Sequence, residues 1–272
     1  MNEPGSRPVV MRTQGIGRVF DGSHGPTVAL ENVSFEVRQR ELICVIGPSG
    51  CGKSTLIRIL AGLDQPTSGE VLLDGKPVDR PGRDRGMVFQ RYTLFPWLTV
   101  AENVMFGLKI AGMKKARAVE LAAHWLDLVG LSHCADHYPE QLSGGMKQRV
   151  AIARALANQP RILLMDEPFG ALDAQTRSTM QSHLLRIWQE IDVTVLFITH
   201  DLDEAVFLAD RIVVLGAHPG RVLETVTVPV PRPRHREQMR SQQFWETRQR
   251  LEELIHPSAS SRSGERLIAV ER

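Results

Sequence analysis

Residues 47–54 of this chain, Gly-Pro-Ser-Gly-Cys-Gly-Lys-Ser, match the phosphate-loop pattern G-x-x-x-x-G-K-[ST]. Glycines let backbone amides curl around an anion, and a helix beginning here directs its positive end at the same point. The pattern predicts that Lys53 reaches the β- and γ-phosphates of a nucleotide and that Ser54 binds magnesium. The residues assigned to nucleotide binding here are Gly47, Pro48, Ser49, Gly50, Cys51, Gly52, Lys53, Ser54 and Thr55.

Two adjacent carboxylates, Asp166 and Glu167, close the apolar stretch at residues 162–165. A carboxylate at such a strand end can hold the magnesium shell, and we assign this to Asp166. Glu167 would then point at the attacking water as general base. Taken alone, the two acids could equally be a surface pair that caps the next helix. Beside a phosphate loop, a catalytic role is favoured.

Residues 142–149, Leu-Ser-Gly-Gly-Met-Lys-Gln-Arg, are the most specific string in the chain. Ser143 is a good helix N-cap, and Gly144 and Gly145 expose the amides of the helix that follows. A single helix start of this kind is usually just a cap. Together with the two preceding motifs, it indicates part of a nucleotide site.

With these three motifs the chain resembles the ATP-binding cassette ATPases over roughly residues 12–228. The resemblance implies ATP and Mg²⁺ as cofactors and ATP hydrolysis as the activity. It also implies that Ser143, Gly144 and Gly145 contact the γ-phosphate bound by a second copy of the subunit. Two nucleotides would then be sandwiched between two subunits in head-to-tail orientation.

The resemblance extends to single residues. Gln90 matches the glutamine that senses γ-phosphate and magnesium, and Asp173 lies in the loop that crosses the dimer interface. His200 matches the switch histidine that hydrogen-bonds the γ-phosphate. Phe20 sits where the family places an aromatic ring against adenine, although a phenylalanine near an edge strand is as readily a core residue. The implied catalytic residues are Glu167, His200 and Lys53, and the implied metal ligands are Ser54, Gln90 and Asp166.

Within that family, residues 88–103 and 217–221 are similar to the importer ATPases of the nitrate, sulfonate and taurine group. This implies a bacterial importer for a small anionic or organic solute, with the chain peripheral on the cytoplasmic face of the cell membrane. The implied partners are a second ATPase subunit in a homodimer, transmembrane permease subunits and, indirectly, a solute-binding protein. The apolar string at residues 94–98 would help form the groove that receives the permease, although packing of the helical insert explains part of it.

Other functions fit the sequence less well. A soluble cassette ATPase of DNA repair or translation often carries tandem cassettes or long coiled-coil inserts, and we identify neither. A non-catalytic nucleotide-binding regulator is disfavoured by the complete set Asp166, Glu167 and His200. A GTPase is disfavoured because no Asn-Lys-x-Asp motif appears. The net charge of +2 gives no argument for nucleic acid, and we expect no nucleic-acid partner.

The elements that must position these residues alternate in type, with short apolar stretches followed by helical spacing. The apolar stretches that read as buried strands are residues 41–46, 86–90, 162–165, 193–198 and 211–215. The alternation predicts an α/β fold, a P-loop NTPase core with a mixed, mainly parallel sheet. Residues 9–38 predict an antiparallel β subdomain, with its strands broken at residues 21–26.

We divide the chain into an ATPase domain at residues 1–230 and a basic C-terminal extension at residues 231–272. A helical subdomain is inserted at about residues 91–157, with helices near 100–111, 114–129 and 146–157. The extension is interpreted as solvated and partly helical, with a disordered end from Pro257. Contact of its arginines with anionic lipid or a partner subunit is left open.

The remaining sequence features concern the compartment and one thiol. No run of about 20 apolar residues that could span a membrane is found, and residues 1–8 lack an apolar signal-peptide core, so the chain reads as cytosolic. Cys51 lies inside the phosphate loop, where a helix N-terminus should lower the pKa of a thiol. We therefore expect a maleimide to inactivate the protein and MgATP to protect it.

Overall fold

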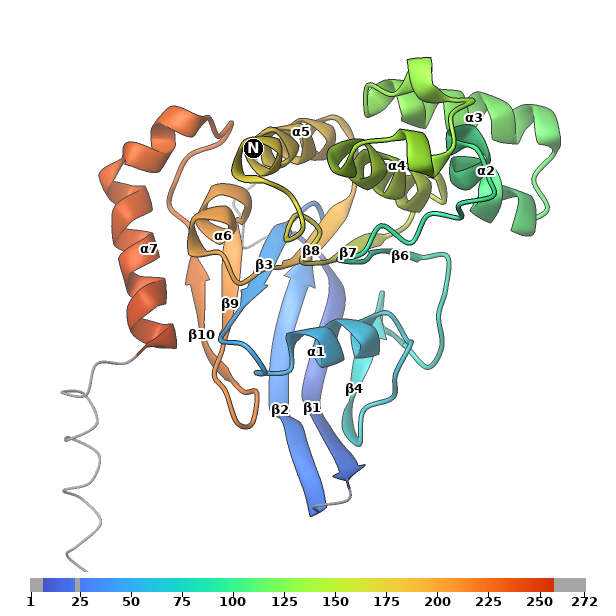
Figure 1. Ribbon diagram of the computed structural model, residues 1–272. Helices are drawn as coiled ribbons and strands as arrows, with labels where there is room; N and C mark the ends of the chain where they lie inside the picture. Colours follow the sequence, from blue (N-terminus) through green and yellow to red (C-terminus); the bar gives the residue numbers. More distant parts are fainter. Residues whose placement is uncertain (1–6, 23–24, 257–272) are drawn as a thin grey trace, which may run out of the picture.

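The computed structural model describes residues 7–22 and 25–256, and it contains two β-sheets with helices packed around them (Figure 1). The smaller sheet has the order β2-β1-β4-β5, and its paired strands are all antiparallel. Its strands are β1 (Val9–Gly22), β2 (Gly25–Arg38), β4 (Ser68–Leu73) and β5 (Lys76–Pro77). The predicted antiparallel β subdomain is therefore confirmed.

The larger sheet has the order β10-β9-β3-β8-β7-β6, and only β10 runs antiparallel to its neighbour. Its strands are β3 (Leu42–Ile46), β6 (Arg85–Val88), β7 (Ile162–Asp166), β8 (Thr194–Ile198), β9 (Arg211–Leu215) and β10 (Val222–Thr227). Strands β3 and β8 are buried along their whole length, as expected of central strands covered on both faces. The α/β fold with a mixed, mainly parallel sheet is confirmed.

The helices cover the larger sheet from two sides (Figure 1). Helix α1 (Lys53–Leu60) packs in one apolar cluster with inward-facing residues of both sheets, such as Ile16 and Val45. The cluster on the other face of the larger sheet includes residues from all the other helices. These are α2 (Val100–Ile110), α3 (Lys115–Leu128), α4 (Gly144–Ala157), α5 (Ala174–Glu190), α6 (Leu202–Leu208) and α7 (Gln242–Ile255).

Helices α2, α3 and α4 form the helical region between β6 and β7, as predicted from the change in composition. Short 3₁₀ helices lie at Ser132–Cys134, Pro139–Gln141 and Arg236–Arg240. None of the helices in the described ranges is both long and apolar enough to cross a membrane.

The predicted break at residues 21–26 is too long, because β1 extends to Gly22 and β2 begins at Gly25. Strands β1 and β2 continue their antiparallel pairing to Asp21 with Pro26 and Gly22 with Gly25. Gly25 has a φ of 103°, which side-chain-bearing residues rarely adopt, so glycine suits the tight return of the chain. Strand β10 was not predicted, because its burial pattern is mostly intermediate and lacks a clear alternation.

The interpretation of the C-terminal extension as solvated is wrong for its described part. Helix α7 is present as predicted, but Phe244 and Leu251 are buried in the main core, and Arg234 is 6% exposed. The arginines that suggested a solvated segment bond to backbone carbonyls and acids of the core. The expected disordered end, residues 257–272, lies outside the described residues, and the division into domains stays a prediction.

Candidate functional site

The phosphate loop joins the buried end of β3 to the start of α1, as the sequence pattern predicted. A Cβ at Gly47 would lie 2.6 Å from the carbonyl oxygen of Leu215, so no larger residue fits there. Gly52 caps α1 with a φ of 89°, in the left-handed region that favours glycine. The loop therefore owes its tight path to glycine at these positions, and it presents the amino end of α1 toward an anion.

Lys53 is buried, and its ammonium lies within the loop. Nζ donates hydrogen bonds to the carbonyl oxygens of Gly47 at 2.8 Å and Pro48 at 3.1 Å. A cation is thus held at the centre of the loop, where a phosphate group would need charge compensation.

The expectation that Cys51 has a lowered pKa is wrong. Its side chain is 0% exposed, and burial raises the pKa of the thiol, although the nearby Lys53 ammonium opposes this effect. Burial destabilises the thiolate by more than one neighbouring cation stabilises it. The expected maleimide inactivation therefore loses its physical basis.

Two oxygen-bearing side chains meet where β7 ends beside the phosphate loop. The Ser54 hydroxyl hydrogen-bonds the Asp166 carboxyl, and the pKa of that carboxyl is raised by burial and by the adjacent Glu167. Parallel strands β3 and β7, with β8 between them, bring their carboxyl ends to one edge of the sheet. The Ser54 hydroxyl at the start of α1 and the Asp166 carboxylate at the end of β7 form a pair of oxygen donors of the type that Mg²⁺ prefers.

Glu167 and His200 are brought together from the ends of neighbouring strands. The His200 Nδ1 atom lies 3.1 Å from Glu167 Oε2. Glu167 has a φ of 42°, an uncommon value for a residue with a side chain, and its N–H donates to the carbonyl of Ile198 at 3.0 Å. The anchored backbone holds the carboxylate at this position at some conformational cost.

Gln90 lies close to Glu167, whereas Phe20 is an exposed residue of β1. Gln90 Nε2 and Glu167 Oε2 both lie near Gly170, at 3.5 and 3.8 Å from the position of a Cβ on that glycine. Phe20 is 39% exposed on β1, with the Arg18 guanidinium 4.6 Å from its ring centre. Exposure excludes the core interpretation of Phe20 and leaves one face of a ring available for stacking.

Ser143, Gly144 and Gly145, which we call the signature residues, contact different neighbours from the phosphate loop of the same chain. Ser143 caps α4 and accepts from the Met146 N–H at 3.4 Å. A Cβ on Gly144 would approach Tyr92 and Leu172, and one on Gly145 would approach Thr176. None of these neighbours is shared with the glycines of residues 47–52, whose neighbours include Leu30 and Leu215.

Asp173 caps the helix that packs on this signature. It accepts a hydrogen bond from the Thr176 N–H at 2.9 Å, which lowers the pKa of its carboxyl. The start of α4 therefore lies against the loop before α5 and the first turn of that helix.

One neighbour of the phosphate loop was missed by sequence reasoning as part of the site. His218 Cε1 lies 3.8 Å from the position of a Cβ on Gly50, and Gly220 donates its N–H to the Ala29 carbonyl at 3.0 Å. Residues 217–221 were singled out as a subgroup motif, and that signal could have placed them beside the loop. They hold β2 and the phosphate loop together.

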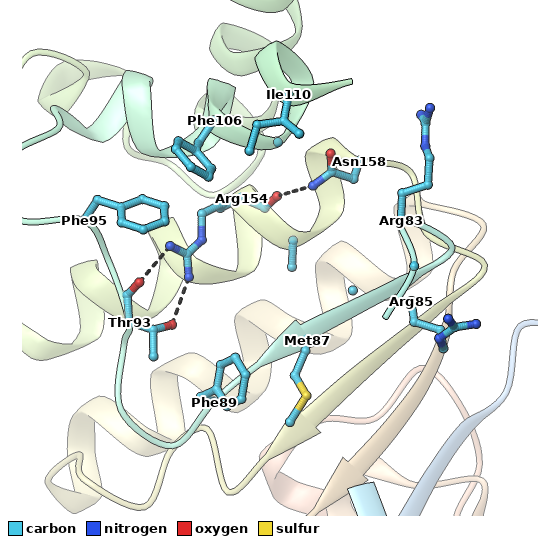
Figure 2. Close-up of a pocket in the computed structure, with 14 residues that line it drawn as sticks. Arg83, Arg85, Met87, Phe89, Thr93, Phe95, Phe106, Ile110, Arg154 and Asn158 are labelled. Carbon is cyan, nitrogen blue, oxygen red and sulfur yellow. Dashed lines mark hydrogen bonds between the residues drawn. The ribbon is translucent and has the colours of Figure 1, made fainter. Parts of the chain in front are cut away.

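A cleft of about 550 Å³ lies between β6 and helices α2 and α4 (Figure 2). Phe95, Phe106 and Ile110 line the cleft. The Arg154 guanidinium lies 5.5 Å from the centre of the Phe95 ring and donates to the Thr93 carbonyl at 2.8 Å. Two large apolar side chains of this region are exposed: Ile110 is 72% exposed, and Trp97, two residues after Phe95, is 70% exposed. Residues 90–95 connect the cleft to Gln90, which lies near Glu167 at the end of the sheet.

Comparison with known proteins gives a consistent result. The model of the ABC transporter family matches residues 30–170. The nitrate import ATP-binding protein NrtD of Synechocystis sp. is 53% identical over 216 residues, covering 79% of this chain and 81% of that protein. The bicarbonate transport ATP-binding protein CmpD of Synechococcus elongatus is 46% identical over 251 residues, covering 91% of this chain and 90% of that protein.

The solved structures add a nucleotide-bound relative. The dimeric cassette MJ0796, in a post-hydrolysis state with ADP and Pi, superposes with a TM-score of 0.70 at 35% identity. The superposition covers 80% of this chain and 98% of that one.

Proposed function

This chain belongs to the ABC transporter family as an ATP-hydrolysing cassette, and from that premise we propose that it energises a bacterial importer for a small anionic or organic solute. The observation that carries the proposal is the pairing of Glu167 with His200 at 3.1 Å, on the sheet edge that also carries the phosphate loop. The names of the nitrate and bicarbonate relatives support a small anion as the class of solute.

The chain's own residues suit the chemistry of phosphoryl transfer to water. Lys53 and the loop amides would bind the phosphates and stabilise charge as the bond to the γ-phosphoryl group breaks. Glu167 would orient the attacking water and accept its proton, while His200 holds the carboxylate through one of its oxygens. Bound Mg²⁺, held by Ser54 and Asp166 with Gln90 nearby, would supply further charge compensation on the phosphate oxygens.

We propose that the site is completed by a second copy of the chain. Ser143, Gly144 and Gly145 share no neighbour with the glycines of the phosphate loop in one chain, which supports their acting on a nucleotide held by the partner subunit. The dimeric ADP-bound relative is consistent with this arrangement. Asp173, next to the signature, would lie at the same interface, and Phe20 would stack on adenine.

The cleft beside residues 90–95 is the proposed contact with the permease. Its apolar lining, which includes the half-buried Phe106 and the exposed Ile110, suits a short amphipathic helix from a membrane subunit. A peripheral position on the cytoplasmic face of the membrane, and an indirect link to a solute-binding protein, belong to the same proposal.

The proposal is tested by expressing the tagged chain with its neighbouring genes and identifying what co-purifies from membranes. We expect a transmembrane permease, phosphate release that needs Mg²⁺, and dimer formation with MgATP in a Glu167→Gln variant. Recovery of repair or translation proteins in place of any membrane partner, by a chain that hydrolyses ATP, would overturn the importer assignment. Nucleotide binding without phosphate release would point to a regulator.

A further inference from the structure

A line of buried polar side chains connects the C-terminal extension to the segment that carries His200. Arg236 Nη2 donates a hydrogen bond to Gln181 Oε1 at 2.7 Å, and Gln181 Nε2 donates to Glu204 Oε1 at 2.8 Å. Glu204 hydrogen-bonds the side chain of Thr199, the residue before His200. The line therefore joins the extension to α5, then α6, then the end of β8.

Three members of this line are buried, and Arg236 at its end is half-buried. Gln181 and Glu204 are each 5% exposed, and Thr199 is 2% exposed. Burial raises the pKa of Glu204, although its hydrogen bonds oppose the effect. Polar groups this deep find their partners only within the protein, so loss of one hydrogen bond forces a rearrangement or leaves a polar atom unpaired.

The far end of the line is fixed to the catalytic pair. The Thr199 Oγ1 atom accepts a hydrogen bond from the Asp201 N–H at 3.0 Å, so the Thr199 side chain bridges the backbone on both sides of His200. His200 in turn contacts Glu167. A change in the Thr199 side chain would therefore change the direction in which the imidazole points.

The other end of the line lies in the C-terminal extension, which is bound firmly to α6. Arg234 is buried and donates to the carbonyl oxygens of Val206, Phe207 and Ala209 at the carboxyl end of α6. The Arg236 guanidinium lies over the Phe207 ring, 4.4 Å from its centre. Cations at the end of a helix compensate its unpaired carbonyls, so both arginines fix the extension onto α6.

We propose that Arg236 is a positioning residue for ATP hydrolysis, which acts through Gln181, Glu204 and Thr199 to hold His200 against Glu167. The inference rests on the proposed roles of His200 and Glu167. It makes the C-terminal extension part of the catalytic apparatus: a partner or ligand that moves the extension would change the rate of hydrolysis without touching the nucleotide.

The test compares two arginines of the extension in the full-length protein. Arg236→Met keeps an unbranched apolar side chain at this position and removes the guanidinium, with its donors to Gln181 and to the Ser178 carbonyl. Arg248→Met is the matched control, because Arg248 also joins the extension to α6, through Asp203 at 3.0 Å, but on the exposed surface. We expect Arg236→Met to lower kcat for ATP about tenfold with KM unchanged, and Arg248→Met to leave kcat within about twofold.

A double-mutant cycle separates positioning from a general structural effect. In a His200→Ala background, Arg236→Met should cause no further loss of kcat, because the residue through which it acts is gone. Gln181→Leu should reproduce the loss of kcat without a substitution in the extension itself. Circular dichroism and thermal unfolding verify that each variant is folded.

The outcomes distinguish this inference from the proposed function. An inactive wild-type protein would contradict the proposed function. An active wild type in which Arg236→Met behaves like Arg248→Met, or in which its effect is as large without His200 as with it, would overturn the positioning role alone. A raised KM with unchanged kcat would also overturn it, since that pattern reports a loss of nucleotide binding.

Discussion

His200 Nδ1 lies 3.1 Å from Glu167 Oε2, and the contact restricts what each side chain can do. An ionised carboxylate can only accept a hydrogen bond, so the Nδ1 atom must carry the proton. The contact occupies Oε2 of Glu167 and leaves Oε1 available to accept a hydrogen bond from a water molecule. It also leaves Nε2 of His200 free of this interaction.

Glu167→Gln should hydrolyse ATP about 10²–10⁴-fold more slowly and should still bind it, because the amide cannot accept the proton of the attacking water. Phosphate release and equilibrium nucleotide binding measure the two effects. Glu190→Gln, on the exposed end of α5, is the control and should turn over normally. Near-normal turnover of Glu167→Gln would assign the base to another group.

Lys53→Ala should weaken ATP binding by about 10–100-fold, the range typical of losing hydrogen bonds from a charged group. The Lys53 ammonium lies inside the loop, within hydrogen-bonding distance of the Gly47 and Pro48 carbonyls, where a phosphate would meet it. Titration with a fluorescent ATP analogue measures the affinity. Lys76→Ala, on the exposed strand β5, should bind as the wild type does. Equal affinities in the two variants would show that the loop binds no phosphate.

Cys51 should resist maleimide in the folded protein. Its pKa is raised above the ordinary value of 9.0, so the reactive thiolate is scarce at pH 7 and increases as the pH rises. We expect labelling at pH 7 to be at least about tenfold slower than in guanidinium, and to accelerate at higher pH. Mass spectrometry of the peptide containing Cys51 measures this. Rapid, complete labelling of the native protein at pH 7 would contradict the burial of the thiol.

The parts of the site that were predicted are those set by local sequence. The phosphate loop is contiguous, and the carboxylates directly follow an apolar strand, so spacing alone placed Lys53, Asp166 and Glu167 at one edge of a parallel sheet. His200 follows a third such strand. The alternation of strands and helices predicted the topology of the sheet, and that topology is enough to bring these residues together at one edge.

The parts that were missed depend on contacts between distant segments. The helix N-terminus beside Cys51 is visible in the sequence, but the neighbours that bury its thiol are not. Arg236 and Gln181 are 55 residues apart in the chain, and no local pattern connects them. Arginine-rich segments are usually solvated, so only the carbonyls at the end of α6 explain why Arg234 is buried.

The cleft in Figure 2 leads to a prediction about the permease. Ile110→Asp should abolish co-purification with a membrane subunit and leave the turnover of the isolated protein unchanged, because a charge would have to be buried at the contact. Val119→Asp is the matched control, since Val119 is 47% exposed on α3 and does not line the cleft. Equal recovery of the permease with both variants would show that the cleft is not the contact.

A separate prediction concerns the pH dependence of folding at Glu41. Its side chain accepts hydrogen bonds from the Arg38 N–H at 2.7 Å and from Arg211 at 3.0 Å, yet burial raises the pKa of the carboxyl above 4.5. In the folded protein the carboxyl therefore keeps its proton to higher pH than in the unfolded chain. The stability it contributes is fully present below about pH 4.5 and is lost as the pH rises through the folded value.

Glu41→Gln removes this titration. The stability of the wild type minus that of Glu41→Gln should therefore decrease as the pH rises above 4.5, by about 1.4 kcal/mol for each unit by which the pKa is raised. Urea unfolding at several pH values measures the difference, with the exposed Glu253→Gln as control. A difference that increases with pH would mean that the ion pair with Arg211 outweighs the loss of hydration, and that the pKa of Glu41 is lowered instead.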